Sequence, residues 1–192
     1  MRVVGGEFRG RRLAGPSDDG GRARLRPTSD RMREAIFNIL VHGDWPPVEG
    51  ARVLDLFAGT GAMGIEALSR GAGKAVFVEN GREALGLLRR NLDALGLTDR
   101  ARILKGDARK LRPPGPFDLV FCDAPYDRGL TVPVLALLVA GDSLAGDAVL
   151  VVETAADETL DLPPGLSLAD ERRYGAGRIR LLRVAEPASR DT

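Results

Sequence analysis

Short apolar runs alternate with stretches of helical character along most of this 192-residue chain. The apolar runs are typical of buried parallel strands and cover residues 53–57, 75–79, 102–104, 117–122 and 148–152. Helices are expected at residues 29–41, 62–70, 82–95 and 130–138. A final strand pair is expected at residues 168–174 and 178–184. This alternation predicts an α/β fold, a doubly wound and mostly parallel seven-stranded sheet of the Rossmann-like kind.

A glycine turn follows the first of these strands directly. Gly59 and Gly61 permit a tight turn and let a ligand approach the backbone closely. The helix that follows would direct its free N–H groups into the same space. Ala62 stands where a P-loop needs lysine, so that site is excluded, although the spacing also matches the looser G-x-G-x-x-G pattern. Asp55 inside the strand and Phe57 before the turn set this loop apart from a dinucleotide site.

Acidic residues close the next strands, where ligands of doubly wound sheets bind. Glu79 lies about 20 residues after the glycine turn, a position from which a carboxylate can accept hydrogen bonds from ribose hydroxyls. Asp107 follows the third strand and could accept a hydrogen bond from an adenine amino group. Its position would equally suit the N-cap of a helix. The sequence therefore predicts one ligand site along this edge of the sheet.

The fourth strand ends in Asp123-Ala124-Pro125-Tyr126, which has the residue types needed to present an aromatic amine for reaction. The lone pair of such an amine is delocalised into the base. The Asp123 carboxylate and the Ala124 carbonyl could accept its two N–H bonds and so localise the lone pair. Tyr126 could stack on a base taken out of its helix. An ordinary Asp-Pro turn is the alternative.

Composition narrows the classes of protein. No apolar run is long enough to span a membrane, and no apolar segment follows the N-terminal arginines as in a signal peptide. One cysteine, Cys122, excludes an internal disulfide and favours a cytoplasmic protein. Because the chain holds a single histidine, no metal site is expected.

Charge is distributed unevenly along the chain. Residues 1–33 contain nine arginines and four acidic residues, whereas the whole chain has a net charge of only +1. We expect residues 1–24 to form a basic hairpin arm, residues 25–186 the main domain and residues 187–192 a polar tail. A basic arm on a mildly acidic body suggests a polyanionic partner, although a solvated tail would have the same composition. The arginines of the expected hairpin are Arg2, Arg9, Arg11 and Arg12.

The glycine turn resembles the D-x-F-x-G-x-G motif of class I S-adenosylmethionine (SAM) methyltransferases, and residues 123–126 resemble the [DN]-P-P-[YF] motif of those that act on exocyclic amino groups. Residues 2–13, 26–34 and 54–61 together resemble the RsmD family, bacterial enzymes that methylate guanine N2 in 16S ribosomal RNA. The resemblance implies that the hairpin arginines touch RNA and that SAM lies among Pro27, Thr28, Asp55, Phe57, Gly59, Gly61, Glu79, Asp107 and Ala108. Ala124 departs from the family's first proline.

We therefore expect a monomeric SAM-dependent methyltransferase that acts on guanine N2 of small-subunit ribosomal RNA, either free or in an assembling subunit. Two alternatives stay open. Methylation of adenine N6 in DNA can use the same four-residue motif, although no separate target-recognition domain is evident. The protein could also be a non-catalytic RNA-binding assembly factor that keeps SAM only as a structural ligand. The presence of Asp123, Pro125 and Tyr126 disfavours this alternative.

Overall fold

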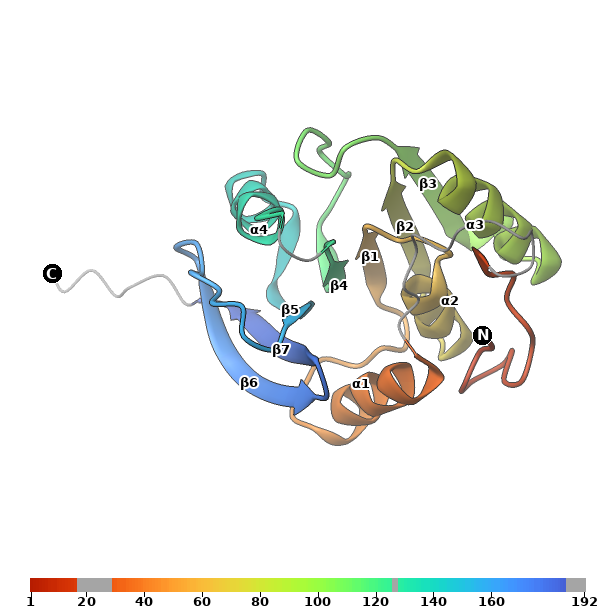
Figure 1. Cartoon of the computed structure of the whole chain (residues 1–192), viewed down its shortest axis with the longest axis horizontal. Coiled ribbons are helices and arrows are strands. Elements are labelled where there is room, and N and C mark those ends of the chain that lie inside the picture. The colour runs from red at the N-terminus through yellow and green to blue at the C-terminus, as the bar shows by residue number, and fades with distance from the viewer. Residues whose placement is uncertain (17–28, 126–127, 186–192) are drawn as a thin grey trace, which may run out of the picture.

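A computed structural model describes residues 1–16, 29–125 and 128–185 and contains one sheet with helices packed on both faces (Figure 1). The strands are Arg52–Leu56 (β1), Lys74–Glu79 (β2), Ala101–Lys105 (β3), Phe117–Asp123 (β4), Leu144–Ala155 (β5), Leu166–Tyr174 (β6) and Gly177–Val184 (β7). The helices are Asp30–His42 (α1), Ala62–Ser69 (α2), Arg82–Ala94 (α3) and Thr131–Ala140 (α4), with a 3-10 turn at Thr98–Arg100 (η2).

The strand order is β3-β2-β1-β4-β5-β7-β6. The first five strands along the chain pair in parallel, and β7 pairs antiparallel with both β5 and β6. This confirms the predicted seven-stranded, mostly parallel sheet. No helix within the described ranges is both long enough and apolar enough to cross a membrane.

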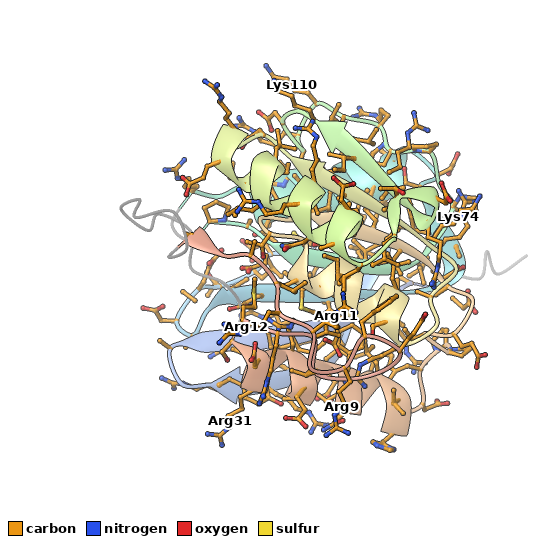
Figure 2. The ribbon with its side chains drawn as sticks, turned by 90° about the vertical axis from the view of Figure 1, so that its right-hand side faces the viewer. Arg9, Arg11, Arg12, Arg31, Lys74 and Lys110 are labelled. Carbon is orange, nitrogen blue, oxygen red and sulfur yellow. The ribbon has the colours of Figure 1, made fainter. Side chains whose placement is uncertain are left out.

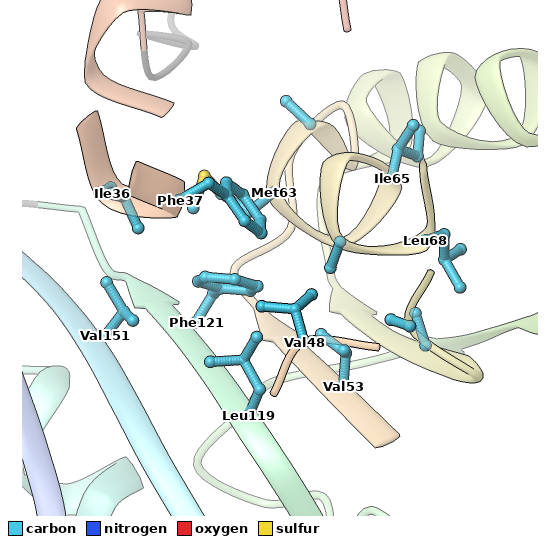
Figure 3. Close-up of a cluster of buried hydrophobic side chains, with 14 of the residues drawn as sticks. Ile36, Phe37, Val48, Val53, Met63, Ile65, Leu68, Leu119, Phe121 and Val151 are labelled. Atoms are coloured by element: carbon cyan, nitrogen blue, oxygen red, sulfur yellow. The ribbon is translucent and has the colours of Figure 1, made fainter. Parts of the chain in front are cut away.

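Alternate residues of the central strands point to opposite faces and join two separate cores. One core combines Val53 of β1 and Phe121 of β4 with side chains of α1, α2 and α3. Figure 3 shows the part where Phe37 of α1 packs on Phe121, with ring centroids 5.6 Å apart. The other core combines Leu54 and Leu56 of β1 with the buried side chains of α4. Because both faces are covered, the central strands are apolar at nearly every position.

Several predicted bounds differ from the structure, and the first and fifth strands show why. The first strand ends at Leu56, and Phe57 has a φ of +57°, because the chain turns sharply there to start the glycine loop. The fifth strand extends beyond the predicted 148–152 at both ends. Its additional residues pair with neighbours, Leu144 with Phe117 and Ala155 with Gly177. Pairing with two neighbouring strands, rather than apolar character, determines its length.

Helix α1 begins as predicted, with the Ser29 side chain accepting a hydrogen bond from the Met32 N–H at 3.1 Å. Its buried face contains one residue that the apolar periodicity missed, Arg33, whose side chain is fully buried. The Arg33 guanidinium donates to the Asp30 carboxylate at 2.6 Å and to the Arg2 carbonyl at 2.5 Å. A buried arginine thus joins the start of α1 to the N-terminal segment.

The N-terminal segment, residues 1–16, packs on the body of the protein. Arg2 and Arg12 form a single antiparallel bridge, and turns fill most of the loop between them, so the hairpin is irregular. Val3 and Leu13 are buried in the core that α1, α2 and α3 share. The segment is therefore a fixed part of the domain surface over its described length.

Backbone hydrogen bonds fasten this segment to α2. The carboxylate of Glu66, which is fully buried, accepts from the Val4 N–H at 2.8 Å. The Ser69 hydroxyl donates to the Gly5 carbonyl at 2.6 Å, and the Ser69 carbonyl accepts from the Glu7 N–H at 2.7 Å. These contacts require a close approach of the two backbones at Gly6, where φ is +74° and a Cβ would overlap the Ser69 carbonyl.

Two glycines of this segment allow a matched test of that approach. Gly6 and Gly10 both have positive φ, but no atom lies within 4 Å of a Cβ built on Gly10. Gly10→Ala should cost about 1–2 kcal/mol of folding free energy from backbone strain alone. Gly6→Ala should cost about 1–3 kcal/mol more because the added methyl overlaps α2. Urea unfolding of both variants measures the difference, and equal losses would contradict the packed arrangement.

Candidate functional site

The carboxyl ends of β2, β1 and β4 lie side by side at one edge of the sheet. Strand order reverses between β1 and β4, since the chain moves outward to β2 and β3 before returning to β4. Ligands of doubly wound sheets bind at such a switch point. The arrangement brings Glu79, Asp55 with its glycine loop, and Asp123 together on three adjacent strands, and Asp107 follows β3, one strand further out.

The glycines after β1 serve two different purposes. Gly59 and Gly61 have φ values of +57° and +81°, which close the turn between β1 and α2. A Cβ on Gly61 would overlap Leu88, and one on Gly64 would overlap the Phe77 ring, so these two glycines permit tight packing. A Cβ on Gly59 would meet only the Phe57 carbonyl, at 3.9 Å. Space for a ligand against the loop is therefore found at Gly59.

Asp55 is buried beneath this loop. Its Oδ2 atom accepts a hydrogen bond from the Gly64 N–H at 2.9 Å, which links β1 to the first turn of α2. Burial raises the pKa of Asp55 to about 8, and the charges of Asp123 and Glu79 raise it further, against the lowering effect of the Gly64 hydrogen bond. The site therefore concentrates negative charge in a place with little water.

Glu79 connects the glycine loop to the turn after β2. One carboxylate oxygen accepts from the Gly59 N–H at 2.7 Å. The other accepts from the N–H groups of Asn80 and Gly81, at 2.8 and 2.7 Å. A carboxylate can accept further hydrogen bonds on its remaining lone pairs. Glu79 thus holds the loop and remains half-buried at the carboxyl edge.

Asp107 caps a turn after β3 and not a helix, since residues 108–110 form a turn. Its Oδ1 atom accepts from the Arg109 N–H at 2.9 Å, and its Oδ2 atom accepts from the Arg109 guanidinium at 2.6 Å. The Arg109 side-chain hydrogen bonds, with help from the backbone bond, lower the pKa of Asp107 to about 2. The neighbouring Ala108 is buried in the core beneath α4. The adenine-binding role of both residues stays a prediction.

The end of β4 places Asp123 half-buried, Ala124 buried and Pro125 exposed. Asp123 pairs in register with Glu153 of β5, so a second carboxylate lies beside it. Cys122 is buried, and burial raises its thiol pKa well above the ordinary range, as expected for an inert residue. The predicted site residues Pro27, Thr28 and Tyr126 lie outside the described residues.

Asn91 of α3 is a residue that sequence reasoning missed. Its side-chain oxygen accepts from the Ala14 N–H at 2.7 Å, and its amide nitrogen donates to the Ala14 carbonyl at 3.2 Å. The same nitrogen donates to the Thr60 carbonyl in the glycine loop at 2.9 Å. The sequence feature that could have identified it is a polar asparagine beside the leucine stripe of α3, directly before Leu92. The N-terminal segment and the glycine loop therefore share one side chain.

The four arginines expected to bind RNA differ in their surroundings. Arg9 and Arg12 are exposed on the side of the molecule that faces the viewer in Figure 2. Arg2 pairs with Asp30 at 3.6 Å, and Arg11 donates to the Ala94 carbonyl at 3.2 Å. Arg9 and Arg12 are therefore more available to a partner than Arg2 and Arg11.

A groove lies away from this edge of the sheet. It measures about 730 Å³ and lies between α1 and β6. Trp45 lines it and packs under the Arg183 guanidinium, 4.6 Å from the ring centroid. None of the predicted cofactor residues that are described contributes to its wall. The acidic carboxyl edge, rather than this groove, is the candidate site.

Solved structures of the same architecture belong to methyltransferases. An Escherichia coli protein described as a candidate methyltransferase has a TM-score of 0.81 and 37% identity, covering 96% of this chain and 97% of that chain. An RNA methyltransferase from Salinibacter ruber, solved with S-adenosyl-L-homocysteine, has a TM-score of 0.66 over 86% of this chain and 98% of that chain. At 15% identity, the second likeness supports the fold alone. The fold is that of a class I methyltransferase.

Sequence comparison identifies the family. A family model described as "Conserved hypothetical protein 95" matches residues 1–183. Ribosomal RNA small subunit methyltransferase D of Escherichia coli (strain K12) is 39% identical over 184 residues, 94% of this chain and 88% of that protein. The protein of the same name from Haemophilus influenzae is 34% identical over 186 residues, 94% of this chain and 92% of that protein. The chain belongs to the ribosomal RNA small subunit methyltransferase D (RsmD) family, which confirms the resemblance seen in the sequence.

The buried carboxyl of Asp55 predicts a pH-dependent stability. Its pKa is about 8 in the folded protein and near 4 in the unfolded chain. Between these values the folded state holds a proton that the unfolded state releases, so stability falls as pH rises and levels off above the folded pKa. Asp55→Asn removes this titration while its amide oxygen can still accept from Gly64. Its stability relative to wild type should therefore rise by up to about 1.4 kcal/mol per pH unit in this window.

Urea unfolding at several pH values from 5 to 9 measures this difference. Asp147→Asn, at an exposed position of β5, controls for the loss of one carboxylate. If the wild-type and Asp55→Asn curves run parallel across this range, Asp55 does not hold a proton in the folded state.

Proposed function

We propose that this chain transfers the methyl group of SAM to the exocyclic N2 of a guanine in small-subunit (16S) ribosomal RNA. The observation that carries the proposal is the position of Asp123-Ala124-Pro125 at the end of β4, directly beside β1 and the loop that follows it. Family membership supports RNA as the substrate, since the relatives are named for small-subunit ribosomal RNA. In this proposal the cofactor binds at the end of β1 and the amine at the end of β4, so the two groups have adjacent sites.

The charge of the carboxyl edge suits SAM, whose sulfonium and ammonium groups are both positive. Repulsion from Asp123 and Glu79 contributes to the raised pKa of Asp55, and a cationic ligand would relieve that repulsion. The open side of Gly59 supports contact with the backbone of the loop. In this proposal Glu79 accepts from the ribose and Asp107 and Ala108 lie at the adenine. The remaining cofactor contacts come from Pro27, Thr28, Asp55, Phe57, Gly59 and Gly61.

The residues after β4 act on the guanine. When bound, SAM supplies an electrophilic methyl group whose bond to sulfur breaks as the new bond to nitrogen forms. Asp123 and the Ala124 carbonyl accept the two N–H bonds of the amine and aim its lone pair at that carbon. The Asp123 carboxylate is also placed to take the proton that the amine loses. Pro125 restricts the loop, and Tyr126 stacks on the flipped base.

The N-terminal segment holds the RNA in this proposal. Arg9 and Arg12 are exposed, and Arg2 and Arg11 lie on the same loop, so phosphate groups can approach several guanidinium groups at once. The RNA is either free ribosomal RNA or an assembling small subunit.

The direct test offers labelled SAM with unmodified small subunits, free small-subunit ribosomal RNA and DNA, followed by nucleoside analysis. N2-methylguanine in RNA is the expected product. N6-methyladenine in DNA would replace the proposal with the adenine alternative. SAM binding without transfer to any of the three substrates would favour a non-catalytic assembly factor.

Glu79→Ala should weaken SAM binding by roughly 1.5–3 kcal/mol, because hydrogen bonds from the ribose to a charged acceptor are lost. Calorimetry of SAM with the RNA-free protein measures this loss. Since Glu79 also holds the glycine loop, thermal unfolding of the variant is recorded alongside. Glu83→Ala, at an exposed position of α3, is the matched control. Unchanged SAM affinity in Glu79→Ala would remove Glu79 from the cofactor site.

Asp123→Ala should abolish methyl transfer and leave SAM affinity nearly unchanged, because this side chain is assigned to the acceptor amine. Asp123→Asn keeps an oxygen that can accept from the amine and is a residue found in the motif, so it should retain measurable turnover. Rates with unmodified small subunits and calorimetry with SAM separate the two effects. Near-wild-type turnover by Asp123→Ala would show that the amine is oriented by other groups.

A further inference from the structure

A second basic stretch lies within the body of the protein. Residues 82–112 contain nine lysines and arginines and only four acidic residues. This excess equals that of residues 1–33, although the chain beyond residue 33 is acidic on average. The acidic average of the chain beyond residue 33 therefore conceals a strongly basic segment at residues 82–112.

These cations lie on neighbouring elements at one edge of the sheet, near the N-terminal segment. The stretch forms α3, the edge strand β3 and the loop after it, which Figure 1 places on the side of the sheet where the chain begins. Figure 2, viewed from that side, places Lys110 beyond α3 on the side away from Arg9, Arg11 and Arg12. Arg11 touches the last turn of α3 through the Ala94 carbonyl. We call this surface, formed by residues 82–112, the α3–β3 face.

Most cations of the α3–β3 face are free of ion pairs with the described residues. Arg109 pairs with Asp107, and Arg100 lies 3.9 Å from Glu7. Six exposed cations form no ion pair within residues 1–16, 29–125 and 128–185: Arg82, Arg89, Arg102, Lys105, Lys110 and Arg112. Their charges are available to a partner.

The opposite edge of the sheet gives the contrast. The β6–β7 hairpin carries five arginines, and four of them form ion pairs, whereas Arg173 donates to the Gly175 carbonyl. Arg172 pairs with Asp170 at 3.0 Å, Arg178 with Glu171 at 3.3 Å and Arg180 with Glu171 at 2.7 Å. The two edges of the sheet therefore differ in free positive charge, because most arginines of the hairpin have an acidic partner and most cations of the α3–β3 face have none among the described residues.

A shallow groove crosses the outer side of α3. It measures about 410 Å³ and is lined by Arg82, Glu83, Gly86, Leu87 and Arg90. No atom lies within 4 Å of a Cβ built on Gly86, so the glycine leaves a depression between the two arginines. The Arg82 guanidinium at this depression can donate N–H groups to a phosphate.

We propose that the α3–β3 face binds the sugar–phosphate backbone of the substrate RNA outside the modified guanine, on the side of the sheet away from β4. The inference rests on the proposed function, which makes RNA the substrate. Helix α3 begins just after Glu79, and the Arg109–Arg112 loop follows β3, so the face runs from the N-terminal segment to the candidate site. Cations on an edge strand also prevent sheet-to-sheet pairing, which accounts for Arg102 and Lys105. That role does not account for the free cations on α3 or in the loop.

The test neutralises one cation in each element of the face: Arg89→Gln on α3, Lys105→Gln on β3 and Lys110→Gln in the loop. Glutamine keeps much of the side-chain length, and none of the three side chains is assigned to the cofactor. The matched control is Arg172→Gln, Arg178→Gln and Arg183→Gln in the β6–β7 hairpin, which removes three charges that are in ion pairs. Affinity for a small-subunit ribosomal RNA transcript is measured against salt concentration, together with SAM affinity and melting temperature.

The slope of log affinity against log salt should fall by about two to three for the α3–β3 variant, because each lost phosphate contact lowers it by about 0.7–0.9. The control should stay near the wild-type slope, and SAM affinity should not change in either protein. If the wild-type protein binds and methylates RNA and the α3–β3 variant keeps the wild-type slope, the RNA-binding role of this surface is wrong and the proposed function stands. Equal losses in both variants would assign the effect to net charge and also overturn it. A wild-type protein that neither binds nor methylates RNA overturns the proposed function and this surface together.

Discussion

The hydrogen bond from the Gly64 N–H to the buried Asp55 carboxylate is the contact on which the candidate site depends. It fixes α2 against the end of β1, and Gly64 permits it because any Cβ there would overlap Phe77. The loop between them then takes its shape from Gly59 and Gly61 and is held from the side by Glu79. An ionisable group is buried to fix a loop, so its oxygen needs a hydrogen-bond donor and its ionised form is unfavourable when no cation is near.

The N-terminal segment depends on a similar device. Glu66 and Ser69 of α2 hold its backbone, Arg33 of α1 holds the Arg2 carbonyl, and Asn91 of α3 holds Ala14. Three helices that build the core thus use buried polar side chains to position a surface segment. These positions fit the helical spacing, but periodicity cannot identify the partner of a polar residue on an apolar face.

Much of the fold could be predicted because the parallel strands carry short apolar runs and helices α1 and α3 carry an apolar stripe. The site residues after β1, β2 and β4 could be placed at one edge because parallel strands bring their carboxyl ends together. The turn at Phe57 could not be predicted, because no feature of the sequence marks an apolar residue that adopts a positive φ. The length of β5 depends on pairing with distant partners. The contacts of Arg33 and Asn91 join segments far apart in the chain, and the free charge of the α3–β3 face becomes visible only when each cation is checked for a neighbour.

Asn91 has a consequence for how members of such a family could diversify. One side chain serves both Ala14, at the end of the N-terminal segment, and Thr60, inside the glycine loop. The segment is therefore not a detachable module that could be exchanged between relatives by cutting at a linker. A chimera that imports a foreign N-terminal segment must bring a backbone that meets Asn91 at the same place, or the glycine loop loses the donor to its Thr60 carbonyl. Changes of target on this scaffold would accordingly have to proceed by substitutions on the surface of the segment, with its backbone path kept.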